Sequence, residues 1–269
     1  MRATKVFLGS EVIVFAIFFS GLFARLHQDV AGPLTLGAFE LSGVVVSLYL
    51  LSRGQGGNAS LLDWLACALA IAVASVGYAG IAITLFALYL FFRDRHDLYT
   101  RAAGTVVAAV IIQAVWAPLV FSKISFLLLQ IDAGIVGSLV SLVLPGASWS
   151  GTIVSTPSGH EVAIYEPCAS FHNLSLASLC WVTLTMLHRP YWSKGDLFIG
   201  VMSAFIQFGF NIWRLVFVCL SLPMYQFWHE GSGKHIFSAV ATATAIVFIQ
   251  TSLVRLDRRN QRIPLAVSP

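Results

Sequence analysis

Long apolar runs separated by short polar segments make up most of the chain. A helix needs about 20 consecutive apolar residues to cross a bilayer, and runs near that length recur along the sequence. No clear cleavage site follows the first run, so we interpret it as a retained helix rather than as a signal peptide. The pattern predicts eight membrane-spanning helices, at Val6–Phe23, Pro33–Leu51, Leu61–Gly77, Gly80–Phe92, Ala102–Phe121, Phe171–Leu187, Leu197–Leu222 and Ile236–Val254.

Two stretches need separate interpretation. Residues 61–92 are too many for one comfortable helix and few for two, and the glycines of Gly77-Tyr-Ala-Gly80 make this segment the predicted break. A ninth apolar stretch, Ile124–Leu144, contains Gln130, Asp132 and several glycines. We expect this stretch to lie in the membrane interface or to re-enter the membrane rather than to span it.

The composition agrees with a membrane protein. Of the 269 residues, 58% are apolar and only 10% are charged, whereas about a quarter of a soluble domain is charged. The sequence predicts an all-α polytopic protein with one integral-membrane domain, divided into spans over 1–144, further spans and outer loops over 145–254, and a basic tail over 255–269. The net charge of +4 does not indicate nucleic acid as a partner, because the basic residues lie in short loops between apolar runs.

The basic residues predict the orientation in the bilayer, because short cytoplasmic loops retain an excess of lysine and arginine. With a cytoplasmic N-terminus, all but four of the 16 lysines and arginines fall inside, the exceptions being Arg25, Lys123, Arg214 and Lys234. Both termini are then cytoplasmic, and the segment before Cys168 lies outside. That segment predicts a short β-hairpin of Thr152–Thr156 and Val162–Tyr165 around a turn at Pro157-Ser-Gly159.

One cysteine lies among polar residues. Cys168 stands in the sequence YEPCASFHN, between Glu166 and His172. The sequence has no CxxC or other metal-ligand spacing, so it predicts neither a metal nor an organic cofactor. The other cysteines lie inside apolar runs, where a thiol usually behaves as a small hydrophobe; they are Cys67, Cys180 and Cys219.

Further polar residues fall on the same predicted face as Cys168. Arg214 lies near the outer end of its helix, and an arginine inside an apolar run is costly and by default functional. Asn211 lies three residues earlier on the same helical face, and His229 lies in the outer loop before the last span. A histidine can take the proton of a thiol and return it to a leaving amine, while an arginine can hold the thiolate or stabilise an oxyanion. Cys168, Arg214 and His229 together suit acyl transfer through a thioester.

The order of these residues resembles the exosortase/archaeosortase family of prokaryotic membrane enzymes. We interpret Glu166-Pro-Cys168-Ala-Ser170 as the family's cysteine motif, Asn211-Ile-Trp-Arg214 as its N-x-x-R motif, and His229–Phe237 as its H-x3-G-x3-F motif. The likeness in motifs extends from Thr152 to Val254. It implies a cysteine peptidase or transpeptidase in which the thiol is the nucleophile and the arginine and histidine are its partners.

The resemblance also implies a type of substrate and a place in the cell. Family members act on membrane-anchored proteins whose C-terminal sorting signal consists of a short motif, one transmembrane helix and a basic tail. They cleave near the motif and can pass the acyl group to water, an amine or a cell-surface glycan. The resemblance therefore implies a multi-pass protein of the bacterial inner membrane with an extracytoplasmic active site, in a family often linked to exopolysaccharide and surface-protein systems.

The sequence departs from the family pattern at two positions. Ser170 stands where the family usually has glycine, and the loss of that glycine would narrow the approach of the backbone to substrate. His172 stands where a basic residue is common, and on a helix it would face the thiol four residues earlier. His172, and His235 at the start of the last span, therefore stay alternatives to His229 as the base. Asn211 could orient either the histidine or the arginine.

Other interpretations stay open. Glu166 could tune the site or simply end a strand, and Cys168 could be a packing residue. An arginine near the end of a span can also extend to the lipid headgroups without any catalytic role. A protein of another class, a transporter or membrane assembly subunit, would have a polar path lined by Arg214, Glu11 and Glu40.

Overall fold

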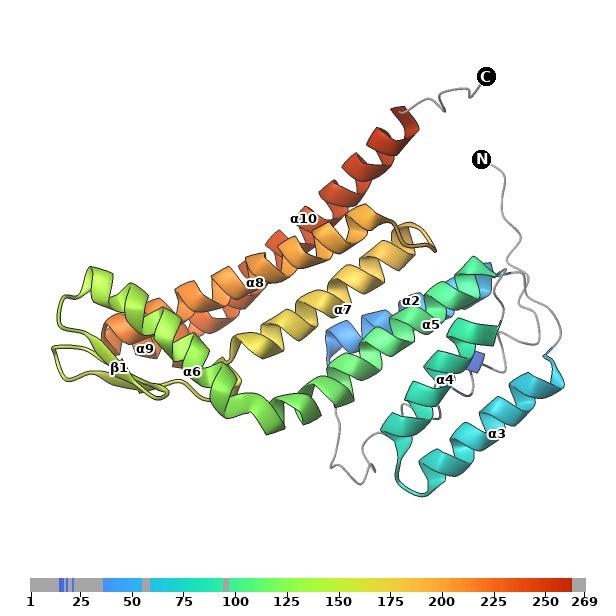
Figure 1. Cartoon of the computed structure of the whole chain (residues 1–269), viewed down its shortest axis with the longest axis horizontal. Helices are drawn as coiled ribbons and strands as arrows, with labels where there is room; N and C mark the ends of the chain where they lie inside the picture. Colours follow the sequence, from blue (N-terminus) through green and yellow to red (C-terminus); the bar gives the residue numbers. More distant parts are fainter. Residues whose placement is uncertain are drawn as a thin grey trace. The chain divides into compact units, whose positions relative to one another are not determined.

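The computed structural model describes residues 15, 16, 18, 21, 36–54, 59–93 and 97–262 of the chain. The α-helices among them (Figure 1) are α2 (Ala38–Arg53), α3 (Leu61–Ser75), α4 (Ala79–Arg93), α5 (Leu98–Ile111), α6 (Ala117–Val143), α7 (Ser170–His188), α8 (Lys194–Leu220), α9 (Leu222–Tyr225) and α10 (Ser232–Arg262). The π- and 3-10-helical segments are η2 (Ile112–Trp116), η3 (Glu166–Cys168) and η4 (Gln226–Glu230), and the strands are β1 (Ser148–Ser150), β2 (Ile153–Ser155) and β3 (Glu161–Ala163). The described residues fall into two compact units, one from residues 1–116 and 182–193 and the other from 117–181 and 194–269.

A buried ion pair joins two helices of the first unit. Ser60 and Asp63 form a reciprocal capping box at the start of α3, in which each side chain accepts a hydrogen bond from the other residue's backbone N–H. The buried Asp63 carboxylate also accepts hydrogen bonds from Arg93 and Tyr89 of α4. The start of α3 is thereby fixed to the end of α4, because breaking the pair would leave a buried charge without compensation.

The predicted break at Gly77–Gly80 is confirmed. α3 ends at Ser75 and α4 begins at Ala79, with Gly77 between them at a φ of +91°, a conformation that favours glycine. Each helix has 15 residues and is about 22 Å long at 1.5 Å per residue. Both are therefore shorter than the hydrocarbon core of a bilayer, which is about 30 Å thick.

The largest difference from the predicted spans follows α4. We expected one span over Ala102–Phe121 and a separate, non-spanning stretch over Ile124–Leu144. The structure instead has one helical run of 46 residues, Leu98–Val143, which passes through α5, η2 and α6. The predicted break was wrong because Ser122 and Lys123 do not stop a helix. The Ser122 hydroxyl donates to a carbonyl one turn earlier in the helix.

The other predicted spans in the described part of the chain match helices, although their ends differ by several residues. Pro33–Leu51 corresponds to α2, Phe171–Leu187 to α7, Leu197–Leu222 to α8, and Ile236–Val254 to α10. Three described helical runs are long and apolar enough to cross a membrane: Leu98–Val143, Lys194–Leu220 and Ser232–Arg259. The chain is thus a helical membrane protein, while the number of eight spans stays a prediction. The first predicted span, Val6–Phe23, lies largely outside the described residues.

Three short strands precede Cys168, where we expected two. β2 and β3 form the expected antiparallel hairpin, and the Gly159 N–H closes its turn by donating to the Thr156 carbonyl. Gly159 has a φ of +80°, and Gly151, between β1 and β2, has a φ of +60°. β1 adds a third antiparallel strand in the order β1-β2-β3. β1 consists of Ser148, Trp149 and Ser150, and the sequence did not indicate this strand because serine is typical of turns.

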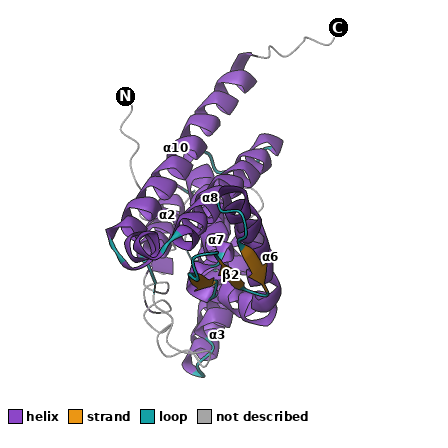
Figure 2. Cartoon of the chain, turned by 90° about the vertical axis from the view of Figure 1, so that its left-hand side faces the viewer, coloured by secondary structure: helices purple, strands orange, loops and turns teal. Residues whose placement is uncertain are grey.

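The sheet packs against α6 within the second unit (Figure 2). A Cβ atom on Gly137 of α6 would lie 2.8 Å from Trp149 of β1, so glycine permits this close approach of the indole. A buried apolar cluster continues from α6 through the sheet to α8, and it includes Val154, Leu215 and Cys168. The sheet, α9 and the start of α10 lie at the same end of this unit (Figure 1), and these elements carry the candidate site.

Candidate active site

A buried thiol and an imidazole meet in the second unit. Cys168 ends the 3-10 turn η3, and its side chain is 3% exposed. His229 belongs to the π-helical turn η4, 61 residues later in the sequence. The Cys168 Sγ atom lies 3.4 Å from His229 Nε2, within the distance for a hydrogen bond that involves sulfur. The pair therefore has the geometry for direct proton transfer between sulfur and nitrogen.

The backbone around Cys168 is fixed from both sides. The Cys168 N–H donates to the Tyr165 carbonyl at 2.8 Å, which closes η3. Ala169 is extended, with a ψ of 137°, and α7 begins only at Ser170. The Ser170 N–H donates to the carboxylate of Asp132 on α6 at 2.8 Å. Asp132 thus satisfies one of the backbone N–H groups that have no partner within the first turn of a helix.

Asn211 of α8 connects the cysteine motif to the arginine. Its side chain is 3% exposed, and its Nδ2 atom donates to the Cys168 carbonyl at 2.9 Å and to the Ser170 hydroxyl at 3.0 Å. Its Oδ1 atom accepts from Asn173 Nδ2 at 2.9 Å and from Arg214 Nη2 at 3.1 Å. Of the two roles left open by the sequence, the structure therefore supports orientation of the arginine rather than of the histidine.

Arg214 lies one helical turn beyond Asn211 with unused hydrogen-bonding capacity. One guanidinium nitrogen, Nη2, donates to Asn211, whereas Nε is buried and has no hydrogen-bond partner in the described part of the chain. A buried polar atom without a partner is costly. The free N–H is therefore suited to a ligand oxygen that enters beside the thiol.

Gly233 explains the spacing of the histidine motif. A Cβ atom at this position would lie 2.7 Å from the Phe227 carbonyl oxygen and 2.7 Å from the Trp228 ring, so a larger residue would push the turn η4 away from α10. Phe237 then packs edge-on against Trp228, with ring centroids 5.4 Å apart. Glycine and phenylalanine in this motif therefore set the path of the turn that carries His229. A π-helical turn is often found at functional sites.

Burial favours the neutral form of both reacting groups. It raises the pKa of the Cys168 thiol, an effect that the positive charge of Arg214 opposes. Burial also lowers the pKa of the His229 imidazole, and the charges of Arg214 and Lys234 lower it further against the opposing effect of Glu230. Both directions favour a thiol beside a neutral imidazole, which can accept the thiol proton.

The structure does not bring the alternative side chains to the thiol. The side chains of His172 on α7, His235 on α10 and Glu166 in η3 are exposed, and in the described part of the chain none of them forms a hydrogen bond with Cys168. Among the three histidines considered as the base, His229 is the one within hydrogen-bond distance of sulfur. Glu40 lies in the first unit, and Glu11 lies outside the described residues.

Sequence reasoning missed three groups around the site. Asp132 carried a signal, because a carboxylate in an apolar helix is costly, but we used it only as an argument against a membrane span. Ser170 was regarded as a lost glycine, whereas its hydroxyl accepts a hydrogen bond from Asn211. Tyr225, whose ring centroid lies 4.8 Å from that of His229, carried no sequence signal.

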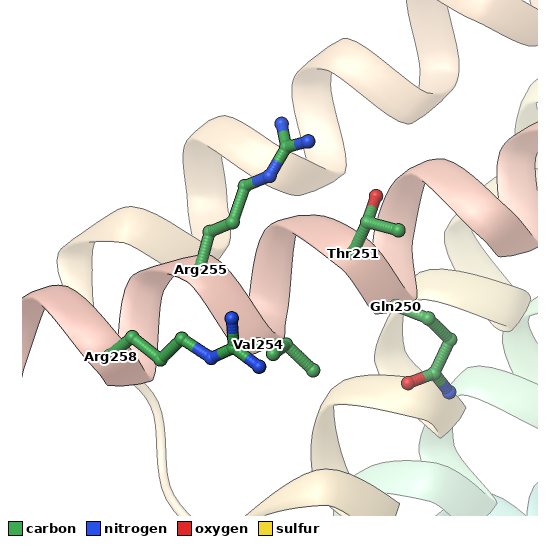
Figure 3. Close-up of a pocket in the computed structure, with 5 residues that line it drawn as sticks. All are labelled: Gln250, Thr251, Val254, Arg255 and Arg258. Atoms are coloured by element: carbon green, nitrogen blue, oxygen red, sulfur yellow. The ribbon is translucent and has the colours of Figure 1, made fainter.

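A separate groove lies near the C-terminal end of α10, with a volume of about 300 Å³. Figure 3 shows its lining: Gln250, Thr251, Val254, Arg255 and Arg258. This groove has no nucleophile or histidine, so it is not a candidate for the chemistry described above. Among the residues that the structure describes, no three His, Cys, Asp or Glu side chains are grouped so that they could hold a metal ion.

The fold and the site together define a class: helical membrane proteins in which a buried cysteine is paired with a half-buried histidine near an arginine. A family model described as transmembrane exosortase (Exosortase_EpsH) matches residues 9–246, and the chain belongs to this family. The match confirms the resemblance inferred from the motifs. No curated protein and no solved structure gives a significant match. Membership supports a broad role as a membrane sorting protein of the transpeptidase type.

Proposed function

We propose that this protein is a cysteine transpeptidase or protease that cleaves the C-terminal sorting signals of exported proteins at the outer face of the bacterial inner membrane. The observation that carries the proposal is the 3.4 Å distance between Cys168 Sγ and His229 Nε2. A structural cysteine needs neither an imidazole at this distance nor an arginine beside it. Family membership supports the same type of reaction.

The first step activates the thiol. As a substrate peptide bond approaches, the proton moves from Cys168 Sγ to His229 Nε2, and sulfur attacks the carbonyl carbon. Displacement of water by the substrate strengthens the attraction between the new thiolate and the Arg214 cation. Arg214 already lowers the pKa of this thiol against the larger effect of burial, so it favours the charged state that the reaction requires.

The second step needs a donor for the oxyanion. When sulfur adds to the carbonyl carbon, the carbonyl oxygen takes the negative charge. In our proposal the unpartnered Nε–H of Arg214 donates to this oxygen, while Nη2 stays on Asn211. Donors that are fixed before the reaction stabilise the transition state most effectively, and the buried Asn211 side chain keeps the guanidinium in place.

The last steps release the two products. The His229 imidazolium gives its proton to the leaving amine, and the carbon–nitrogen bond breaks to leave a thioester on Cys168. Neutral His229 then takes a proton from water, an amine or a glycan hydroxyl as this acceptor attacks the thioester carbonyl carbon. The carbon–sulfur bond breaks, and the imidazolium returns the proton to sulfur, which restores the thiol. The acceptor decides whether the overall reaction is hydrolysis or transpeptidation.

The place of the site in the fold suits a substrate anchored in the membrane. Arg214 lies in the last two turns of the membrane-spanning helix α8, and Cys168 lies between the small sheet and α7. We infer that the scissile bond enters near the membrane surface, while the substrate's own helix stays in the bilayer. The eight spans and cytoplasmic termini inferred from the distribution of lysine and arginine place this end of the unit outside the cytoplasm.

The test compares the C-terminal peptides of all exported proteins by mass spectrometry. Cells that lack the chain are complemented with the wild-type protein, with Cys168→Ala, or with Cys180→Ala as a matched control on α7. We expect the wild-type and Cys180→Ala cells to contain proteins that have lost a C-terminal helix and basic tail. In Cys168→Ala cells these proteins should stay intact. The same truncated proteins in Cys168→Ala cells would exclude Cys168 as the nucleophile.

The same variants distinguish the enzyme from a transporter or assembly subunit. A polar path through Arg214 and Glu40 would depend on those charges and not on the thiol. Loss of function in Glu40→Gln cells with normal function in Cys168→Ala cells would favour transport. Arg214 instead contacts Asn211 beside the cysteine motif, which supports a role in the reaction at sulfur.

A further inference from the structure

In the described part of the chain, no third group forms a hydrogen bond with the imidazole of His229. In many cysteine–histidine sites, an acidic or amide side chain accepts from the other ring nitrogen and fixes the orientation of the base. Here Nδ1 of His229 is buried and has no hydrogen-bond partner in the described part of the chain. Asn211, an obvious candidate, makes its hydrogen bonds to the cysteine motif, Asn173 and Arg214 instead.

An aromatic ring instead contacts the face of the imidazole. The ring of Tyr225 stacks on the ring of His229, with centroids 4.8 Å apart and an angle of 18° between the planes. Tyr225 is four residues before His229 in the continuous turn from α9 to η4, so the two side chains share one helical face. Tyr165 is also near, but its ring is 6.2 Å away and tilted by 58°.

Tyr225 is itself held in position. His160, in the turn after β2, packs edge-on against it with centroids 6.0 Å apart and an angle of 76°. The His160 Nε2 atom lies 3.2 Å from the carbonyl oxygen of Val218 on α8. The contacts of His160 with Tyr225 and of Tyr225 with His229 therefore connect the β2–β3 hairpin to α8 and to the turn that carries the base.

The charges around His229 explain why an aromatic contact would stabilise its protonated form. When His229 takes the thiol proton it becomes a cation close to two others, Arg214 and Lys234, with Glu230 as the opposing charge. The face of an aromatic ring attracts a cation at this distance. Tyr225 stacks on the imidazole without bringing in another charge, so it stabilises the imidazolium while leaving the neutral ring free to accept the proton.

We propose that Tyr225 is the third member of a Cys168–His229–Tyr225 triad, in which a stacked aromatic face takes the place of a hydrogen-bonded carboxylate or amide. The proposal rests on the function proposed above. Tyr225 is a positioning residue: it keeps Nε2 directed at sulfur and stabilises the imidazolium that forms when the proton leaves the thiol. The ring carries this role, and the hydroxyl does not.

The test measures how fast Cys168 reacts with a small thiol reagent in the purified full-length protein, by mass spectrometry of the peptide that contains it. The variants are Tyr225→Phe, Tyr225→Leu and the matched control Tyr165→Leu, each with His229 intact and with His229→Ala. Tyr225→Met, which also lacks a π face, replaces Tyr225→Leu if the latter does not fold. Thermal unfolding of each variant checks the fold.

We expect Tyr225→Leu to slow the reaction of Cys168 by about 2- to 30-fold, the effect of a lost cation–π contact. Tyr225→Phe and Tyr165→Leu should stay within about twofold of the wild-type rate. In the His229→Ala background, Tyr225→Leu should have no further effect, because a residue that acts only through the imidazole is coupled to it. A residue that merely supports the fold would slow both backgrounds alike.

Three results would overturn the proposal: a normal rate in Tyr225→Leu, an equal loss in Tyr225→Phe, or an equal loss with and without His229. A fourth result distinguishes failure of the proposed role of Tyr225 from failure of the proposed function of the protein. If His229→Ala alone leaves the reactivity of Cys168 unchanged, then the thiol is not activated by the imidazole. The proposed function then fails together with the triad.

Discussion

Asn211→Leu is the substitution that tests the described site most directly. Leucine keeps the branching pattern of the asparagine side chain but removes four hydrogen bonds, to the Cys168 carbonyl, Ser170, Asn173 and Arg214. Hydrogen bonds between membrane helices contribute about 0.6 kcal/mol on average and at most about 1.7 kcal/mol each. Groups that stay buried without a partner add to the loss. We therefore expect the free energy of unfolding to fall by about 2–5 kcal/mol.

The assay is thermal unfolding of the purified protein beside measurement of its processing activity. A loss of about 2–5 kcal/mol corresponds to a melting temperature lower by about 5–20 °C, at roughly 2–4 °C per kcal/mol for larger domains. Asn173→Leu is the matched control, because it removes only one of the four bonds and should lower the melting temperature by about 1–5 °C. Activity in Asn211→Leu should fall about 100-fold, since Arg214 and the cysteine backbone lose their shared support.

The difference between Asn211→Leu and Asn173→Leu tests the reasoning better than either melting temperature alone. If Asn211 connects the cysteine motif to Arg214, its replacement must cost clearly more than that of Asn173. Equal melting temperatures for the two variants, together with normal processing in Asn211→Leu, would refute the reasoning. A lower melting temperature with normal activity would leave Asn211 as a structural residue and would separate the network from the reaction.

The remaining predictions concern the turn, the arginine and the thiol. Gly233→Ala should displace η4 and destabilise the protein by about 1–3 kcal/mol, because the new Cβ atom would lie 2.7 Å from the Phe227 carbonyl oxygen. The control is Gly209→Ala, where nothing lies within 4 Å of the new Cβ atom. This control should behave as wild type in thermal unfolding and processing. Arg214→Lys keeps the charge but loses the planar set of donors. Processing should therefore fall by about 10²–10³-fold, the usual effect of a lost oxyanion donor. Full activity in this variant would show that the positive charge alone is sufficient. The alkylation rate of Cys168 should rise with pH above neutrality, because burial raises the pKa of its thiol. Arg214→Gln should move this pH profile to higher pH, because the Arg214 cation lowers that pKa. A shift to lower pH would contradict the role assigned to Arg214. A membrane-impermeant thiol reagent should label Cys168 from outside the inner membrane in cells with a permeable outer membrane, and labelling only from the cytoplasmic side would reverse the proposed topology.

The helices were predictable from the sequence because apolar runs are long enough to show where a chain enters a bilayer. Their ends were less predictable, and the run from α5 to α6 shows why. Ser122 and Lys123 interrupt the apolar pattern without interrupting the helix, since a serine hydroxyl can donate to a carbonyl within its own helix. Hydropathy indicates the surroundings of a residue, whereas backbone hydrogen bonds decide where a helix ends.

The site was predictable in its chemistry and less so in its connections. Arg214 was recognisable because an arginine inside an apolar run is rare. Cys168 and His229 were recognisable because they fall on the same predicted face as Arg214, and because the order of all three resembles a known family. The structure adds the contacts between them, which depend on three-dimensional packing. Asp132 contacts Ser170 across 38 residues of sequence, and Asn211 contacts Cys168 across 43. No local pattern in a single sequence reports such pairs.

The same limit explains why the sequence left His172 open as an alternative to His229. His172 is four residues after Cys168, and on one continuous helix the two side chains would share a face. However, Cys168 belongs to a 3-10 turn, Ala169 is extended, and α7 begins only at Ser170. The thiol is therefore outside the helix that carries His172, whose side chain is exposed. Ala169, which separates the thiol from α7, is followed directly by Ser170, whose hydroxyl accepts a hydrogen bond from Asn211. The residue that replaces the family's glycine thus becomes part of the network that holds the nucleophile.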